Sequence, residues 1–181
     1  MLLISQNLTN YDLEFPKDTV LRINLAWIFD LNALENFISK YDNDIFLDMP
    51  LGRKKPPSNF YSIEELKPII FDNPKIKYFA ISNVESPSVI REYYSIFLDK
   101  VTLVPKIESI KGIENIKQIA DALNMENRTI MLDHDDLYSD TVKEGQSPED
   151  FSKHIDALVS FCSNENINLL RTRGVIFSDK I

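Results

Sequence analysis

The sequence predicts an α/β fold built on a parallel sheet. Short apolar runs of strand length alternate along its 181 residues with segments whose apolar residues recur at helical spacing. Strands that alternate with helices form βαβ units, in which the strands are parallel and the crossovers right-handed. The pattern leaves two architectures open. One is an open doubly wound sheet, and the other is a trimmed (β/α) barrel, since a complete barrel takes about 200 residues or more.

The first elements are a strand, a helix and a second strand. VLRINLAW, residues 20–27, and DIFLDMP, residues 44–50, are apolar runs of strand length, and a proline stops the second. Between them, residues 30–41 place apolar side chains at helical spacing, with Asp30 in position to cap the helix. The opening residues 1–5 (MLLIS) are a candidate for an additional strand.

A capping box predicts where the next helix begins. Ser62 and Glu65 have the spacing at which each side chain can bond the backbone N–H of the other residue. A helix is therefore expected over residues 62–71, although Pro68 disturbs its second turn. IKYFAIS, residues 76–82, is the strand that follows.

The second half of the chain repeats the alternation. Helices are expected over residues 86–100 and 147–162, each of which begins with a serine cap followed by proline. The strand VTLVPKIE, residues 101–108, contains Pro105, which has no N–H for the sheet, so the strand is expected to bulge or end there. The remaining predicted elements are a helix with apolar positions between 113 and 123, and the strands 129–136 (TIMLDHDD) and 167–177 (INLLRTRGVIF).

An acidic composition excludes several classes of protein. The net charge is -8, the pI is about 4.8, and no basic stripe of the kind that binds nucleic acid is present. The densest basic stretch, residues 52–57 (GRKKPP), is interpreted as a solvated loop. No run approaches the roughly 18 apolar residues of a membrane span, and the start of the chain lacks the pattern of a signal peptide. We therefore expect no nucleic-acid partner and no membrane.

Cysteine and histidine are scarce. Cys162 is the only cysteine, which excludes an internal disulfide and fits a reducing, cytoplasmic location. It falls on the apolar face of a predicted helix and is expected to be a buried, inert thiol. With only His134 and His154, a multi-histidine metal site is excluded, and four glycines do not supply a phosphate-binding loop.

Polar side chains gather at the carboxyl ends of the predicted strands, where both architectures place reactive groups. Period-two alternation puts Lys106 and Glu108 on one face of their strand, and Arg22 and Asn24 on one face of theirs. The convergent set is expected to contain the charged residues Glu108, Asp136, Asp133, Asp48, Lys106 and Arg22, joined by Arg171 or Arg173 if the last strand extends that far.

Two carboxylates on adjacent strand ends suit a hard cation. Mg²⁺, or Mn²⁺ in its place, takes one or two protein carboxylates and completes its coordination with water and substrate oxygens. A lysine and an arginine nearby would hold an anionic substrate and stabilise negative charge that develops on it. These groups together suit the formation of an enolate from a carboxylate-bearing substrate.

Each of these features also has a purely structural interpretation. A Lys-x-Glu pair is common at a solvated strand edge, and residues 133–140 (DHDDLYSD) also fit an acidic surface loop. Arg22 and Asp48 would then form a structural ion pair. His134 would be an ordinary loop residue rather than a base.

Taken in order, the motifs resemble the barrel domain of pyruvate kinase. Residues 76–97 (IKYFAISNVESPSVIREYYSIF) are similar to its fourth strand, serine-containing turn and helix. Residues 103–123 (LVPKIESIKGIENIKQIADAL) resemble its Lys-Ile-Glu strand and helix, and residues 129–137 its next strand. Upstream, LRINLAW and IFLDMPLGRKKP resemble its Arg-x-Asn-Phe-Ser and Leu-Asp-Thr-x-Gly-Pro strands. Related metal-dependent aldolases and citrate lyase β-subunits share the Ile-Glu-x-x-x-Gly-x-x-Asn pattern but lack the lysine.

The resemblance implies one domain over residues 1–181, a (β/α) barrel of the TIM type that is trimmed or incomplete at about seven strands. It also implies that Glu108 and Asp136 are metal ligands, that Lys106 stabilises an enolate and that Arg22 faces the substrate. Asn24 and Asp48 match two ligands of the family's monovalent cation site. The complete set of candidates for substrate binding is Arg22, Asn24, Asp48, Ser82, Arg171 and Arg173.

Departures from the family pattern disfavour kinase chemistry. Ala26 and Met49 stand where the family has the serine and threonine of its K⁺ site, and Asp135 replaces a glycine beside the metal-binding aspartate. About 20 residues separate Pro57 from the next strand, where the kinase inserts a lid domain. Phosphoryl transfer depends on screening the phosphates from water, so pyruvate kinase activity is not expected.

Two hypotheses follow. The first is a Mg²⁺-dependent enzyme that forms or stabilises the enolate of pyruvate, another 2-oxo acid or an enolpyruvate-type substrate, as a carbon–carbon lyase or aldolase does. Its substrate would be a small anionic metabolite, and Asp133 or His134 would transfer the proton. The second is a non-catalytic barrel remnant that binds a metabolite or a protein partner. A partial barrel leaves an open edge that another subunit would cover, so a homo-oligomer is expected.

Overall fold

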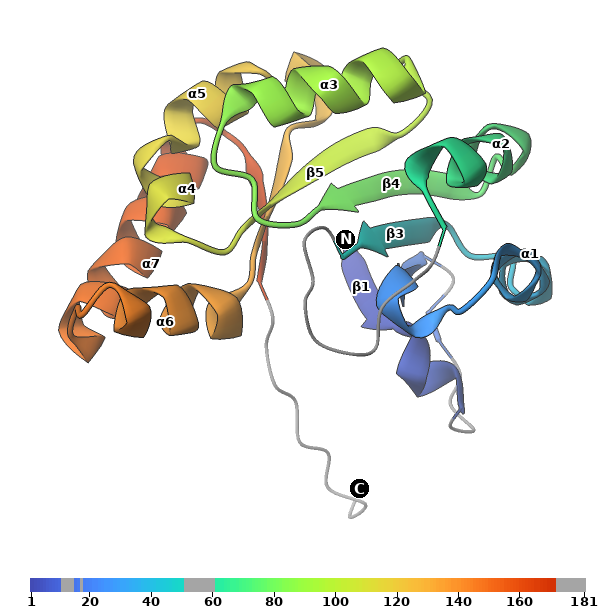
Figure 1. Ribbon diagram of the computed structural model, residues 1–181, viewed down its shortest axis with the longest axis horizontal. Helices are drawn as coiled ribbons and strands as arrows, with labels where there is room; N and C mark the ends of the chain where they lie inside the picture. Colours follow the sequence, from blue (N-terminus) through green and yellow to red (C-terminus); the bar gives the residue numbers. More distant parts are fainter. Residues whose placement is uncertain (11–14, 17, 51–60, 172–181) are drawn as a thin grey trace.

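The chain folds into a seven-stranded parallel sheet (Figure 1). The computed structural model describes residues 1–10, 15–16, 18–50 and 61–171. The strands are hydrogen-bonded in the order in which they occur along the chain. They are β1 (Leu2–Ser5), β2 (Thr19–Asn24), β3 (Ile45–Met49), β4 (Ile76–Ile81), β5 (Thr102–Ile107), β6 (Thr129–Leu132) and β7 (Asn168–Arg171). A doubly wound sheet reverses its strand order at a switch point. The order observed here contains no reversal, so that alternative is wrong.

Helices connect the strands along one side of the sheet (Figure 1). Three short 3-10 helices are η1 (Gln6–Asn10), η2 (Leu25–Trp27) and η3 (Met125–Asn127). The α-helices are α1 (Leu31–Lys40), α2 (Ile63–Asp72), α3 (Pro87–Phe97), α4 (Ile110–Glu114), α5 (Ile116–Asp121), α6 (His134–Lys143) and α7 (Pro148–Asn164). None of the helices in the described ranges combines the length and the apolar character that crossing a membrane requires.

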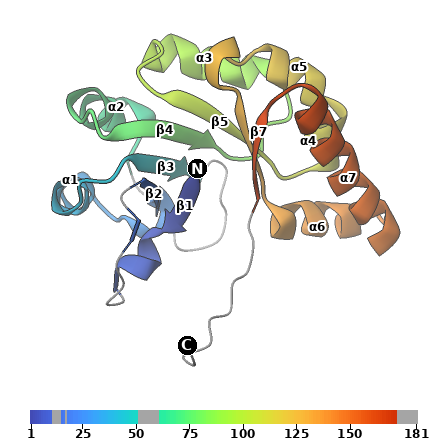
Figure 2. The same cartoon turned by 180° about the vertical axis from the view of Figure 1, so that it is seen from behind.

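The sheet curves into a half barrel that is not closed. Its edges are β1 and β7 (Figure 2), and no strand pairing joins them among the described residues. A cavity of about 590 Å³ is lined by residues of both edge strands, including Leu3 and Leu170, and by Arg22 and Met131. The seventh strand predicted at the start of the chain is confirmed as β1.

The two faces of the sheet bury different cores. Toward the helices, the strands contribute a large aliphatic and aromatic cluster that includes Leu47, Phe79 and Leu132. Toward the inside of the half barrel, only a small apolar cluster is buried, made of Val20, Phe46, Ala80, Val104 and Met131.

Polar residues lie directly beyond the inner cluster. Because side chains alternate along a strand, the residue two positions further on points to the same face. Val20 is followed in this way by Arg22, and Val104 by Lys106. Phe46 is likewise followed by Asp48, so the inner face changes from apolar to charged as the strands approach their carboxyl ends.

Side-chain caps start several helices where the sequence predicted them. Asp30 caps α1 through its carboxylate. The capping box of Ser62 and Glu65 is present at α2, and Ser147 caps α7 in the same way. Pro68 lies inside α2 without ending it. These confirmed boundaries depend on hydrogen bonds between residues close in sequence.

Two predicted strands are longer than the observed ones. The strand predicted at 20–27 ends at Asn24, whose side chain accepts a hydrogen bond from Ala26 N at 3.0 Å and starts η2. The strand predicted at 129–136 ends at Leu132, and the acidic residues after it form the start of α6 instead. A local N-cap decides both corrections, because a capping side chain competes with continued strand pairing.

The other boundaries differ less. The helix predicted after β5 is divided into α4 and α5 at Asn115. Cys162 is buried in the outer core, as predicted. The basic stretch 52–57 and residues 172–177 of the last predicted strand lie outside the described residues.

Candidate functional site

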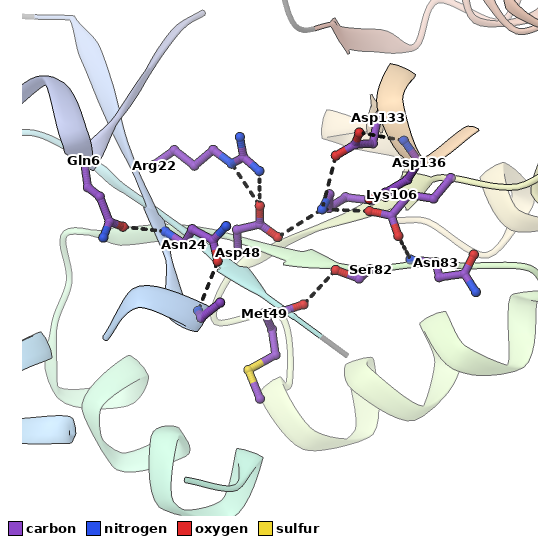
Figure 3. A network of polar contacts seen from close by, with 12 residues as sticks. Gln6, Arg22, Asn24, Asp48, Met49, Ser82, Asn83, Lys106, Asp133 and Asp136 are labelled. Atoms are coloured by element: carbon purple, nitrogen blue, oxygen red, sulfur yellow. Dashed lines mark hydrogen bonds and ion pairs between the residues drawn. The ribbon is translucent and has the colours of Figure 1, made fainter. Parts of the chain in front are cut away.

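A network of charged side chains lies at the carboxyl ends of the strands, above the inner apolar cluster (Figure 3). Arg22 comes from β2, Asp48 from β3 and Lys106 from β5. Glu108 follows β5 directly, and Asp133 follows β6. The parallel sheet brings together five side chains that are up to 111 positions apart in sequence.

Lys106 lies at the centre of the network. Its Nζ atom is 2.7 Å from Glu108 Oε1, 3.5 Å from Asp48 Oδ1 and 3.8 Å from Asp133 Oδ2. The residue is 6% exposed. Burial alone would lower the pKa of Lys106, but the neighbouring carboxylates outweigh it and raise the pKa above its ordinary value. The lysine is therefore a buried, fully charged ammonium at neutral pH.

Arg22 and Asp48 form a second ion pair beside it. Arg22 Nε donates to Asp48 Oδ2 at 2.9 Å, and Nη2 donates to the same oxygen. Asp48 is 2% exposed and also contacts Lys106 through Oδ1, so it joins the two cations. Its neighbours in the sheet are Asn24 of β2 and Ala80 of β4. Asp48 therefore holds in place the guanidinium of Arg22, which lines the cavity between β1 and β7.

Three carboxylates gather on the other side of Lys106. Glu108, Asp133 and Asp136 each offer one oxygen, and these oxygens all lie within 4.8 Å of one another. Asp133 caps α6 by accepting a hydrogen bond from Asp136 N at 3.3 Å, so the first turn of the helix carries Asp136 toward the end of β5. The end of one strand and the start of one helix thus build the cluster.

The two oxygens of Glu108 have different surroundings. Oε2 accepts a hydrogen bond from Asn83 N at 2.7 Å. Oε1 is buried beside the Lys106 ammonium, but no hydrogen-bond donor among the described residues is aligned with it. Burial raises the pKa of Glu108, and the negative charges of Asp133 and Asp136 add to this, while Lys106 opposes it. A cation near Oε1 would favour the ionised carboxylate.

The donor set fits Mg²⁺ or Mn²⁺, which bind carboxylate oxygens. The network holds two cations, Arg22 and Lys106, and four carboxylates, Asp48, Glu108, Asp133 and Asp136. Two negative charges are therefore in excess, which a divalent cation would balance. Glu108 Oε1 is buried and lies 2.7 Å from Lys106 Nζ, so a bound cation would share the Glu108 carboxylate with the ammonium.

Two of the predicted substrate-binding side chains contact backbone atoms. Asn24 Oδ1 accepts from Ala26 N, and Ser82 Oγ donates to Met49 O at 2.9 Å. Both residues lie at strand ends, as the sequence predicted, and Figure 3 shows them on the same side of the sheet as Asp48.

His134 and Arg171 lie next to each other at the far end of the network. Arg171 Nη2 is 3.4 Å from His134 Nε2. Burial and the Arg171 charge lower the pKa of His134, so the imidazole is neutral at pH 7. Its Nδ1 atom is buried and has no hydrogen-bond partner among the described residues. Arg173, the last predicted substrate-binding residue, lies outside the described residues.

The sequence did not identify Asn83. It placed Asp133 in the convergent charged set as a candidate for proton transfer, but not among the metal ligands. The position of Asp133 as a helix cap could have been predicted, because an aspartate followed within three residues by two more acidic residues is typical of a helix N-terminus. Asn83 acts through its backbone N–H, which no side-chain pattern reports.

Solved structures that share this fold include RipC and an HpcH/HpaI aldolase. RipC from Yersinia pestis matches with a TM-score of 0.61 and 18% identity, over 88% of this chain and 72% of that chain. The HpcH/HpaI aldolase from Desulfitobacterium hafniense DCB-2 matches with a TM-score of 0.62 and 11% identity, over 87% of this chain and 69% of that chain. No family model and no curated protein matches the sequence. The chain therefore shares the fold of these two proteins, which supports the predicted resemblance at the level of the fold.

Proposed function

We propose that the half barrel is a trimmed barrel of the TIM type and that its charged edge is the active site of a divalent-metal-dependent enzyme. The reaction would form or stabilise the enolate of a 2-oxo acid or enolpyruvate-type substrate, in the manner of a carbon–carbon lyase or aldolase. The observation that carries the proposal is the cluster of Glu108, Asp133 and Asp136 beside a buried, charged Lys106. The fold that the chain shares with a protein described as an HpcH/HpaI aldolase supports the reaction class.

Each charged residue has a separate role in this proposal. Glu108, Asp133 and Asp136 would hold Mg²⁺ or Mn²⁺, which when bound would polarise a substrate oxygen as a Lewis acid. Lys106 presents a preorganised positive charge next to the cluster, where negative charge on an enolate would develop. The Arg22 side chain is 23% exposed and is oriented by Asp48, so it would hold an anionic group of the substrate.

Proton transfer and the remaining substrate contacts are assigned by position. Asp133 contacts Lys106 and belongs to the cluster, whereas the neutral His134 lies beside Arg171. These two residues are the candidates for the proton-transfer group. Because Asn24 and Ser82 contact backbone atoms, we assign recognition of the substrate's charge to Arg22.

Metal binding tests the site directly. We expect calorimetry to detect Mn²⁺ or Mg²⁺ binding to the parent protein and to detect none in Glu108→Gln, which keeps the shape of the side chain but removes its charge. Asp121→Asn is the matched control, because Asp121 pairs with Lys117 on an exposed helix surface. If Glu108→Gln binds the metal as tightly as the parent does, the proposed metal site is wrong.

Isotope exchange tests the chemistry. In D₂O, the enzyme would exchange the methyl protons of pyruvate for deuterium in a reaction that requires divalent metal and is lost in Lys106→Ala. Nuclear magnetic resonance would follow the disappearance of the methyl signal over a panel of 2-oxo acids. The absence of exchange across the panel would contradict the enzyme proposal.

The open edge of the half barrel favours the second candidate, a non-catalytic oligomeric barrel remnant. Met1 and Leu2 at the β1 edge are 51% and 49% exposed, and their surface would be covered in an oligomer. This candidate predicts a mass above that of the monomer under non-denaturing conditions, together with no metal-dependent exchange. An active monomer would exclude it.

A further inference from the structure

The loop between β4 and α3 is fastened to both neighbouring strands. Ser82 Oγ donates to Met49 O at the end of β3, at 2.9 Å. Val84 N donates to Lys106 O on β5, at 3.1 Å. The two contacts lie on either side of Asn83, so the backbone of the loop is held at the level of the charged network.

Helix α4, which follows β5, also holds this loop in place. Asn115 Nδ2 donates to Glu85 O at 2.9 Å. A Cβ atom at Gly112 would lie 3.0 Å from Val84 O, so a glycine allows α4 to approach the loop this closely. Three hydrogen bonds to three separate elements, together with the close approach of Gly112, therefore leave the loop little freedom to move relative to β5.

Asn83 has a left-handed backbone conformation within this loop, with φ of 47°. Its N–H donates to Glu108 Oε2 at 2.7 Å, as Figure 3 shows for the labelled Asn83. The Asn83 side chain is exposed and makes no polar contact with the described residues. Asparagine tolerates the left-handed region better than most residues. The position therefore requires the backbone conformation rather than the side chain.

We infer that Asn83 is a positioning residue, whose left-handed backbone directs its N–H at Glu108 Oε2 and turns Oε1 toward Lys106 and the carboxylate cluster. The inference rests on the proposed metal site and extends it to a residue that touches neither metal nor substrate. A carboxylate held at one oxygen has one direction in which to present the other. Without this hydrogen bond, the ion pair with Lys106 alone would orient the Glu108 carboxylate.

A matched pair of substitutions tests the inference. Valine disfavours the left-handed region at any site. Asn166 is a second exposed asparagine with positive φ, 53°, in the turn between α7 and β7, where that strand begins. We expect Asn83→Val and Asn166→Val to lower the melting temperature by similar amounts. Only Asn83→Val should weaken Mn²⁺ binding, by about tenfold, the lower end for loss of a residue that orients a metal ligand.

A glycine at position 83 tests whether the loss of Mn²⁺ affinity comes from the backbone conformation or from a general loss of stability. Asn83→Gly keeps the N–H and accepts positive φ, so we expect it to restore the Mn²⁺ affinity lost in Asn83→Val. Equal affinity in Asn83→Val and the parent would overturn the inference. A comparable loss of affinity in Asn166→Val would also overturn it, because the effect would then be one of stability.

A measurement without metal keeps the inference independent of the proposed function. We expect the Asn83 amide proton to exchange slowly in the parent and faster in Glu108→Ala, while exchange at Asn166 stays the same. Unchanged exchange at Asn83 would overturn the inference whether or not the protein binds metal. A parent protein that binds no Mn²⁺ while Asn83 exchange responds to Glu108→Ala would overturn the metal site and support the hydrogen bond.

Discussion

The two faces of the sheet are built from the same strands but bury different chemistry. On the outer face, side chains such as Phe79 and Leu47 pack against helices in one large apolar core. On the inner face, the apolar cluster contains five buried residues and is followed by charged side chains. Successive side chains of a strand point to opposite faces of the sheet, so one strand can contribute to the apolar core on one face and to a charged site on the other.

This difference explains why the charged network can be buried. Lys106 and Asp48 are nearly inaccessible, and burying a charge is costly unless it is paired. Each of them has partners of opposite sign within 4 Å. The large apolar burial on the outer face compensates for a polar inner face that contributes little to stability.

The largest expected effect compares two phenylalanines on adjacent strands. Phe79 of β4 lies in the outer core and Phe46 of β3 in the inner cluster, and both are fully buried. We expect Phe79→Ala to lower the free energy of unfolding by about 4 kcal/mol, because it leaves a cavity in a close-packed core. Phe46→Ala should cost about half as much, since few apolar neighbours surround it. Urea denaturation measures both, and a larger loss for Phe46→Ala would contradict the contrast between the faces.

A second prediction concerns the charge balance of the inner face. Lys106→Met removes the ammonium from three carboxylates and should lower the free energy of unfolding by about 3 kcal/mol in the absence of divalent metal. Added Mg²⁺ should recover part of the loss, because it binds the folded state alone. Lys117→Met is the control, since Lys117 forms an exposed pair with Asp121 and should change stability by less than about 0.5 kcal/mol. Equal losses in the two variants would show that the inner network is not energetically distinct.

The smallest effect at neutral pH concerns the thiol of the outer core. Burial raises the pKa of Cys162 from 9.0 to about 11. The unfolded chain ionises first, so the contribution of this group to stability is complete below pH 9 and declines as the pH rises toward 11. We expect Cys162 to react with a disulfide reagent at pH 8 only when urea unfolds the protein. Rapid reaction of the folded protein would mean that the outer core is open near α7.

The sequence predicted most of the scaffold because the relevant signals are local. Capping residues such as Ser62 and Ser147 lie within three positions of their partners, and most strands are short segments rich in apolar residues. The start of α6 is not predicted, because its acidic residues lack an apolar stripe until Leu137, and the predicted strand therefore continues through Asp133 to residue 136.

The sequence predicted which residues form the site better than it predicted the contacts between them. Alternation placed Lys106 with Glu108, and the parallel order placed them near Arg22 and Asp48. The structural interpretation of Arg22 and Asp48 as an ion pair agrees with their geometry, yet the contact of Asp48 with Lys106 depends on the register of β3 through β5. No local sequence pattern predicts the register between strands that are far apart in sequence, or the left-handed backbone conformation of Asn83.

The strand order also sets a sequence of events in folding. Since each strand pairs with the one before it, every new pairing joins segments that are consecutive strands of the chain, which limits the entropy cost of closing each loop. During synthesis the sheet would grow from β1 onward. Arg22 and Asp48 would meet first and neutralise each other, and β5 would then deliver Lys106 together with Glu108. The last two carboxylates would arrive with β6 and α6, so the excess negative charge would be assembled only on a sheet that is already rigid enough to hold it.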